Sequence, residues 1–230
     1  MAGSSDLNRP LLWALALLTV VSGLIDAVSY LGLGHVFTAN MTGNVVLLGF
    51  AAAGAPGFSV AASLASLTAF LAGAVCAGRL ILAVSGRRHL LLISLAVEGL
   101  LTGFASTVAW LAPTVAAGWA RFVVVVLLAF GMGIRNSMIR RLAVPDVTTT
   151  VLTMTLAGLA ADSSLAGGDN VRMGRRGGAV AAMLAGALAG AWLYLHHRAG
   201  LPLTVAAVFV LATAAVFGRV PASRRLDAAP

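Results

Sequence analysis

The chain has 230 residues, of which 60% are hydrophobic and 10% are charged, and its mean hydropathy is +0.99. A soluble domain is roughly half apolar and about a quarter charged, so this composition excludes a water-soluble protein and indicates a polytopic membrane protein. The net charge is +8, and all the basic residues are arginines, which cluster between apolar segments as membrane orientation requires. That placement argues against a nucleic-acid partner. The single cysteine, Cys76, excludes an intrachain disulfide and a cysteine metal cluster.

Apolar segments alternate with short polar connections after a polar tail at residues 1–10. The segments lie at 11–33, 37–54, 58–84, 89–111, 117–138, 147–163, 177–195 and 201–218. A membrane-crossing helix needs about 20 residues to cover a hydrocarbon core about 30 Å thick. The first segment exceeds the ~7–15-residue apolar region of a cleaved signal peptide, so we expect it to remain as a span. The second and sixth segments are too short to cross in the same way.

Two polar stretches open these short segments and resemble each other. Residues 36–44 read Val-Phe-Thr-Ala-Asn-Met-Thr-Gly-Asn, and residues 147–155 read Val-Thr-Thr-Thr-Val-Leu-Thr-Met-Thr. An unpaired polar group in hydrocarbon is energetically costly. Polar breaks at matching places in two halves of a membrane protein therefore indicate a buried binding or permeation site.

The arginine positions favour six crossings plus two short re-entrant or broken segments. If all the segments crossed from a cytoplasmic N-terminus, the arginines at 87–88 and 135–141 would lie outside, against the positive-inside rule. The reverse orientation would place the arginines at 172–176 and 219–225 outside instead. If the two short segments enter and leave on one side, both termini and nearly all arginines are cytoplasmic. Two arginines then lie near the outer face, Arg121 and Arg198.

The two halves of the chain share further sequence at a nearly constant offset. The polar stretches align at an offset of 111 residues, and the Leu-Ala-Gly-Ala sequence at 71–74 recurs at 184–187. Residues 23–26 resemble residues 133–136. We therefore predict two membrane repeats, 11–111 and 112–218, followed by a cytoplasmic tail at 219–230. Three crossings in each half would make the repeat inverted, as in many transporters.

The polar stretches supply most of the candidate substrate-binding residues. Thr and Asn are good N-cap residues, and a helix start attracts an anion or an electronegative atom. The same hydroxyls and amides could replace the hydration shell of a cation, or could only cap and pack helices. Met154 stands where the first stretch has glycine, so the two stretches are not equivalent. The candidates are Asn40, Thr42, Gly43, Asn44, Thr149, Thr150, Thr153 and Thr155.

Two carboxylates lie within apolar segments and are candidates for coupling. Asp26 is deep in the first span, where a carboxylate is costly and indicates function; it could bind a proton or cation, or pair with Arg135. Glu98, nearly midway along the fourth segment, could relay protons or hold helices together. The residues that follow Asp26 or match it in the second half are further substrate-binding candidates: Ser29, Tyr30, Arg135 and Asn136.

Other features predict partners less specifically. Gly186 and Gly190 form a Gly-x-x-x-Gly pair, which permits close helix contact either within the chain or at a homodimer seam. The sequence shows no nucleophile–base pair, glycine-rich phosphate loop or metal-ligand spacing. We therefore predict no catalytic residues, metal or cofactor, although Asp26, His35 and Glu98 could converge in an intramembrane enzyme.

The run at 22–44 resembles the signature of the YoaK-like bacterial membrane proteins, a family with a domain of unknown function. The resemblance lies in a Gly-x-x-Asp-Ala start at 23–27 and an Asn-Met-Thr-Gly-Asn end at 40–44, and it covers residues 11–218. At the family's second motif, Arg135 replaces glutamine and Met154 replaces glycine. The resemblance implies a bacterial inner-membrane protein but no substrate.

The sequence thus predicts an all-α polytopic membrane protein that contacts the lipid bilayer and a small solute or ion. The preferred function is a transporter or channel with a midplane site between the two short helices, in which Asp26 could couple transport to protons or cations. A non-transporting membrane partner or assembly protein is the main alternative. The sequence distinguishes neither the solute nor a channel from a carrier.

Overall fold

The computed structural model describes residues 5–84, 86–112, 115, 118–142, 152–170 and 173–220, apart from the side chains of 5–10 and 142. Thr149 and Thr150 lie outside the described residues. The long helices are α1 (Ser5–Gly32), α3 (Val60–Ala83), α4 (Arg87–Leu111), α5 (Trp119–Leu142), α7 (Met173–His196) and α8 (Gly200–Arg219). The short ones are α2 (Met41–Ala52), α6 (Leu152–Ala161) and the single 3-10 turn η2 (Ser164–Ala166). Among described residues, six helices are long and apolar enough to span a membrane, which confirms the predicted all-α fold with two short apolar helices.

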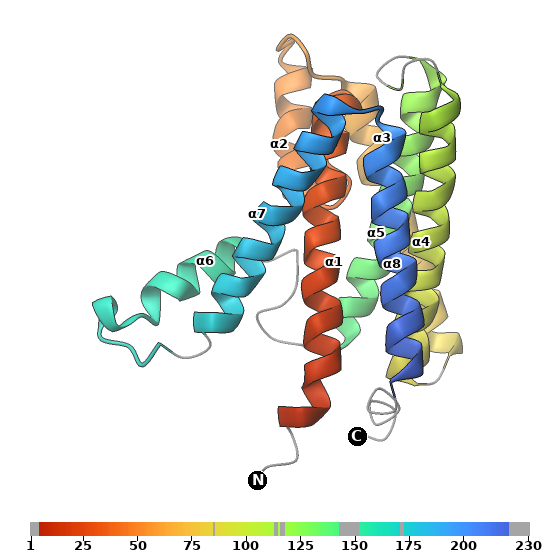
Figure 1. The fold of residues 1–230 in the computed structure, drawn as a ribbon. Coiled ribbons are helices and arrows are strands. Elements are labelled where there is room, and N and C mark those ends of the chain that lie inside the picture. The colour runs from red at the N-terminus through yellow and green to blue at the C-terminus, as the bar shows by residue number, and fades with distance from the viewer. Residues whose placement is uncertain are drawn as a thin grey trace.

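The long helices lie side by side, with the start of α1 and the end of α8 at the same end of the bundle (Figure 1). α1 packs mainly on α7, α3 on α5, and α4 on both α5 and α8. Arginines mark this end: α4 begins at Arg87, α5 has Arg140 and Arg141 in its last turn, and α8 ends at Arg219. Arg121, in the first turn of α5, lies at the opposite end. These arginines therefore divide between the two ends as the charge pattern predicted. Arg135 does not follow the pattern, because it is buried inside the bundle.

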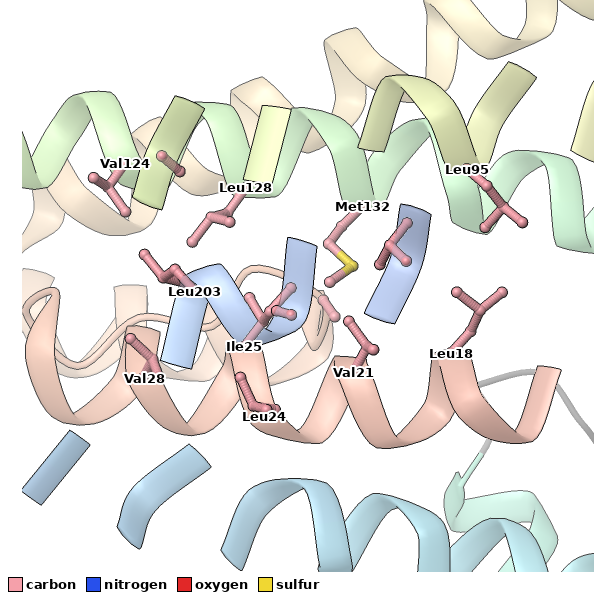
Figure 2. Close-up of a cluster of buried hydrophobic side chains, with 14 of the residues drawn as sticks. Leu18, Val21, Leu24, Ile25, Val28, Leu95, Val124, Leu128, Met132 and Leu203 are labelled. Atoms are coloured by element: carbon pink, nitrogen blue, oxygen red, sulfur yellow. The ribbon is translucent and has the colours of Figure 1, made fainter. Parts of the chain in front are cut away.

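The buried apolar core lies between α1, α4, α5 and α8. Figure 2 shows Leu18, Ile25 and Val28 of α1 opposite Leu128 and Met132 of α5, with Leu95 of α4 and Leu203 of α8 beside them. These side chains are at most 3% exposed, whereas the outward surface of α3 carries exposed leucine and valine. Apolar side chains on both the inside and the outside are what a helix bundle in lipid requires.

Several helices extend beyond the apolar segments that predicted them. α1, α4 and α7 begin earlier than residues 11, 89 and 177, and α5 continues past 138. The added turns contain Arg, Leu and Met, which are strong helix formers and continue a helix past the apolar stretch. α2 is shorter than its predicted segment, because the polar stretch before Met41 is not helical.

Two helix pairs approach each other closely through glycines. Where α3 crosses α5, a β-carbon at Gly73 would overlap the carbonyl oxygen of Phe130, and one at Gly133 would overlap that of Phe70. Where α1 crosses α7, Gly23 lies against the Met183 carbonyl. Gly186 and Gly190 lie against the Val20 and Leu24 carbonyls. The Gly-x-x-x-Gly pair therefore packs within the chain.

Alanine substitution should distinguish two glycines of α3. Gly73→Ala must push α3 away from α5, and overpacking of this kind costs about 1–3 kcal/mol. A β-carbon added at Gly78 would meet no neighbouring atom within 4 Å, so Gly78→Ala should be neutral or stabilising through helix propensity. We expect the Tm in detergent to fall for Gly73→Ala and not for Gly78→Ala. Equal Tm values would contradict the close crossing.

Candidate functional site

Asp26 holds the first polar stretch against α1. Its Oδ1 accepts hydrogen bonds from the backbone N–H groups of Thr38 at 3.0 Å and Ala39 at 2.9 Å, and a longer one from the Thr38 hydroxyl at 3.4 Å. These bonds fold the chain back beside α1 after that helix ends at Gly32. The Asp26 side chain is 4% exposed, and its Oδ2 is buried with no hydrogen-bond partner among the described residues. Oδ1 therefore accepts three hydrogen bonds, whereas Oδ2 accepts none from the described residues.

Asn40 and Asn44 have different tasks at the start of α2. Asn40 is the N-cap, and its side-chain oxygen accepts from the Gly43 N–H at 3.3 Å. Asn44 is fully buried; its amide accepts from the Phe37 N–H at 2.8 Å, and donates to the Phe37 carbonyl at 2.6 Å and to the Ser66 hydroxyl at 3.0 Å. Asn44 therefore fastens the stretch before α2 to α3, whereas Asn40 is exposed.

A cavity of about 470 Å³ lies where the starts of α2 and α6 meet. Asp26 and Ser22 of α1 line it, together with residues from the two polar stretches. Its walls also include the middle of α3 at Phe70 and the middle of α7 at Met183. The complete lining is Ser22, Asp26, Ala39, Asn40, Met41, Thr42, Gly43, Val46, Phe70, Leu152, Thr153 and Met183. The volume lies within the range of small-molecule sites.

Some of the predicted substrate-binding residues line this cavity and others do not. Five predicted residues line it, Asp26, Asn40, Thr42, Gly43 and Thr153, whereas six other described candidates do not: Ser29, Tyr30, Asn44, Arg135, Asn136 and Thr155. Ser29 donates to the Asp26 carbonyl, and Tyr30 stacks on Phe37 with ring centroids 5.0 Å apart. Thr155 is buried within α6. Ser29 and Tyr30 therefore make contacts within α1 and with the first polar stretch.

Arg135 pairs with Glu98, not with Asp26. Its Nη1 lies 2.8 Å from Glu98 Oε1, and both side chains are at most 1% exposed. The guanidinium also donates to the hydroxyl of Ser22, one turn before Asp26 on α1, and lies 3.5 Å from the Leu18 carbonyl. The alternative of an Asp26–Arg135 ion pair is therefore wrong, because α4 packs against α5 and presents Glu98 to the guanidinium. Glu98 itself does not line the cavity.

Seven cavity residues were not among the predicted site residues. Four of them lie in the two short segments, Ala39, Met41, Val46 and Leu152, and three lie on the long helices, Ser22, Phe70 and Met183. Phe70 and Met183 directly precede the two copies of Leu-Ala-Gly-Ala, at 71–74 and 184–187. Their equivalent positions in the two halves were a signal that could have identified them. Ser22 carries no such signal, since a serine in an apolar helix often only bonds the preceding turn, as Ser22 does with the Leu18 carbonyl.

The family comparison covers nearly all of these elements. The family model described as "Protein of unknown function (DUF1275)" matches residues 14–216. The chain belongs to this family. Every described residue that lines the cavity falls within the DUF1275 match. The YoaK-like resemblance predicted from the sequence is thereby confirmed.

A curated relative supports the same assignment. The chain is 36% identical over 151 residues to the UPF0700 transmembrane protein YoaK of Bacillus subtilis (strain 168), an alignment covering 65% of this chain and 66% of that protein. No solved structure matches the chain. The transmembrane relative and the six apolar helices together identify this DUF1275 chain as a multi-pass membrane protein.

Proposed function

We propose that this protein is a small-solute transporter or channel of the bacterial inner membrane, and that the solute binds in the cavity between the starts of α2 and α6. The observation that carries the proposal is the convergence of Asp26, Asn40, Thr42 and Thr153 on one cavity. Non-helical backbone and polar side chains at membrane depth are tolerated mainly where they line a cavity. Phe70 and Met183 lie near the middle of their spans, which supports a position near the midplane.

The glycine contacts support an inverted repeat around this site. The contact of Gly23 with the Met183 carbonyl has a counterpart in that of Gly133 with the Phe70 carbonyl. Gly186 against Val20 likewise matches Gly73 against Phe130. In each case the α1 and α5 positions differ by 110 residues and the α3 and α7 positions by 113, as in the sequence repeat. Binding sites of inverted-repeat transporters lie between the two repeats. Residues from both halves of this chain likewise line the cavity.

In this proposal the two short helices, α2 and α6, are re-entrant segments. α2 lies at the end of the bundle where α1 ends and α3 begins (Figure 1), so the chain enters and leaves this region on one side. With that geometry, the arginine-rich end, where α1 begins and α8 ends, faces the cytoplasm. The repeat and the topology together describe a fold in which two segments from opposite faces meet at the solute.

Substitution of Asp26 distinguishes a coupled carrier from a passive channel. The charged groups nearest to it are Arg135 on α5 and, beyond that guanidinium, Glu98 on α4. A carrier that couples transport to a proton or cation at Asp26 should lose pH-dependent uptake in the Asp26→Asn variant, with folding intact. A passive channel should keep its uptake unchanged. Glu98 would contribute to coupling through Arg135 and Ser22.

Ligand-induced thermal stabilisation tests the proposed function. We expect at least one solute among a panel of anions, cations, amino acids and nucleobases to raise the Tm of the purified wild-type protein. The Asn40→Ala/Thr42→Ala variant removes two cavity side chains and should reduce this rise about tenfold in apparent affinity, as for one or two lost hydrogen bonds. The same variant without solute serves as the control. A panel in which no solute stabilises the wild type would count against a transporter.

The alternatives receive less support from the geometry. A non-transporting assembly protein would need no cavity at Asp26, yet the cavity reaches this carboxylate. An intramembrane enzyme would need two titratable groups within hydrogen-bond reach, and among described residues neither His35 nor Glu98 joins Asp26 in the cavity lining. We propose no enzymatic activity.

A further inference from the structure

The electrostatics of the cavity indicate which class of solute it selects. The start of α2 would attract an anion if its backbone N–H groups were free. The N–H groups of Thr38 and Ala39 instead donate to Asp26, and that of Gly43 donates to the side chain of Asn40. The protein's own carboxylate thus takes the backbone N–H groups that precede α2, and the Asn40 amide caps one N–H group of the first turn. An anionic solute would meet Asp26 at close range.

Asp26 brings a negative charge to the cavity that no ion pair compensates. Among described residues, no arginine or histidine lines the cavity. The nearest guanidinium, that of Arg135, is held at 2.8 Å by Glu98. A buried carboxylate without an opposite charge is strongly disfavoured, so a positive charge that reaches Asp26 will be bound well. Oδ2 is buried and has no hydrogen-bond partner among the described residues, so a cationic group that reaches Asp26 would satisfy it.

The remaining walls suit an organic cation more than a metal ion. Besides Asp26, the polar groups are the side chains of Ser22, Asn40, Thr42 and Thr153. The other walls are apolar, with Met41, Val46, Phe70, Leu152 and Met183. A bare alkali cation requires a shell of oxygen ligands, whereas an alkylammonium group requires one carboxylate and gains from apolar and aromatic surfaces. The volume of about 470 Å³ also exceeds what a single ion fills.

We infer that the cavity binds a small organic ammonium ion, with its cationic head at Asp26 and its alkyl part against Phe70, Met183 and the neighbouring apolar walls. This inference rests on the proposed function, because it names the solute class of the same site. Asn40, Thr42 and Thr153 would then accept from or contact the head group or a hydroxyl on the solute. The nitrogen's charge, rather than its shape, provides the discrimination.

Three probes of nearly one shape test this inference: choline, its neutral isostere 3,3-dimethylbutan-1-ol and the anion 3,3-dimethylbutanoate. Each is titrated against the purified full-length protein in detergent at constant ionic strength, with binding followed by Tm and by calorimetry. We expect choline to bind at least about tenfold more tightly than the neutral isostere, because its quaternary nitrogen has no N–H to donate but carries a charge that Asp26 and the ring of Phe70 attract. The anion should show no binding.

Two isosteric variants locate the effect. Asp26→Asn keeps an oxygen for the Thr38 and Ala39 N–H groups but removes the charge, so it should fold and lose choline binding about tenfold or more. Asp169→Asn makes the same chemical change at an exposed residue outside the cavity and should leave binding unchanged. Size-exclusion profiles and Tm values confirm that both variants fold.

Each outcome separates the inference from the proposed function. Equal or tighter binding of the neutral or anionic probe would overturn the organic-cation inference while leaving a solute site in place. Choline binding that persists in Asp26→Asn would also overturn it. If none of the three probes binds, the inference is wrong, and the wider solute panel then decides separately whether the transporter proposal survives.

Discussion

Replacing Arg135 with methionine should destabilise the protein more than any other single substitution considered. Arg135 and Glu98 form an ion pair that is almost completely buried between α4 and α5. Removal of one partner leaves the other as an uncompensated charge, which typically costs about 3–5 kcal/mol. Unfolding in detergent, followed by circular dichroism, should show a correspondingly lower Tm for Arg135→Met. Ser22 keeps its own hydrogen bond to the Leu18 carbonyl, so the loss comes mainly from Glu98.

A double variant identifies the cause of that loss. Arg135→Met/Glu98→Leu removes both charges, and replacing a buried pair with apolar residues of similar volume is often neutral or stabilising. We therefore expect the double variant to recover most of the Tm lost in Arg135→Met. A double variant as unstable as the single one would show that packing around the guanidinium, rather than the charge on Glu98, sets the cost. Transport by a folded double variant would also show whether Glu98 takes part in coupling.

Two substitutions of Asp26 should distinguish its structural role from its functional role. Asp26→Ala removes the acceptor of three hydrogen bonds and leaves the N–H groups of Thr38 and Ala39 buried, which should cost about 2–4 kcal/mol. Asp26→Asn preserves the acceptor and should cost about 1 kcal/mol or less. Hydrogen exchange of the amides at 38 and 39 measures the difference directly: rapid in Asp26→Ala and slow in Asp26→Asn. Equal exchange in both variants would contradict the tether seen in the structure.

The fold followed from composition and charge to a large extent. The apolar segments were long enough to define six spans, and the arginine pattern required two shorter segments. Helix ends were harder to predict, because arginine continues a helix at the membrane surface as readily as leucine does. Packing partners could not be predicted, since α1 contacts α7, and α3 contacts α5, although neither pair is adjacent in the sequence. Only the Gly-x-x-x-Gly pair, Gly186 and Gly190, indicated close contact in advance.

The candidate site was predicted in outline but not in detail. Asp26, Asn40, Thr42 and Thr153 were recognised because polar residues in apolar sequence are costly, and all of them reach the cavity. Asn44 was recognised by the same rule, yet its amide is used on the Phe37 backbone seven residues earlier. The chemistry of an asparagine does not reveal which of these roles it has. Likewise, the partner of Arg135 depends on which helix lies beside α5, and sequence does not give that neighbour.

The most direct test of a solute cavity at membrane depth is the aqueous accessibility of Thr42. Thr42 is exposed to the cavity at the start of α2, and the natural cysteine, Cys76, lies exposed on α3 outside the cavity lining. In a Cys76→Ala background, Thr42→Cys is treated in membrane vesicles with a charged, membrane-impermeant thiol reagent, and the wild-type protein reports the reactivity of Cys76. We expect rapid modification at position 42 and little at Cys76, because only the cavity admits water. Modification of Thr42→Cys by a lipid-soluble reagent alone would contradict a solute site between α2 and α6.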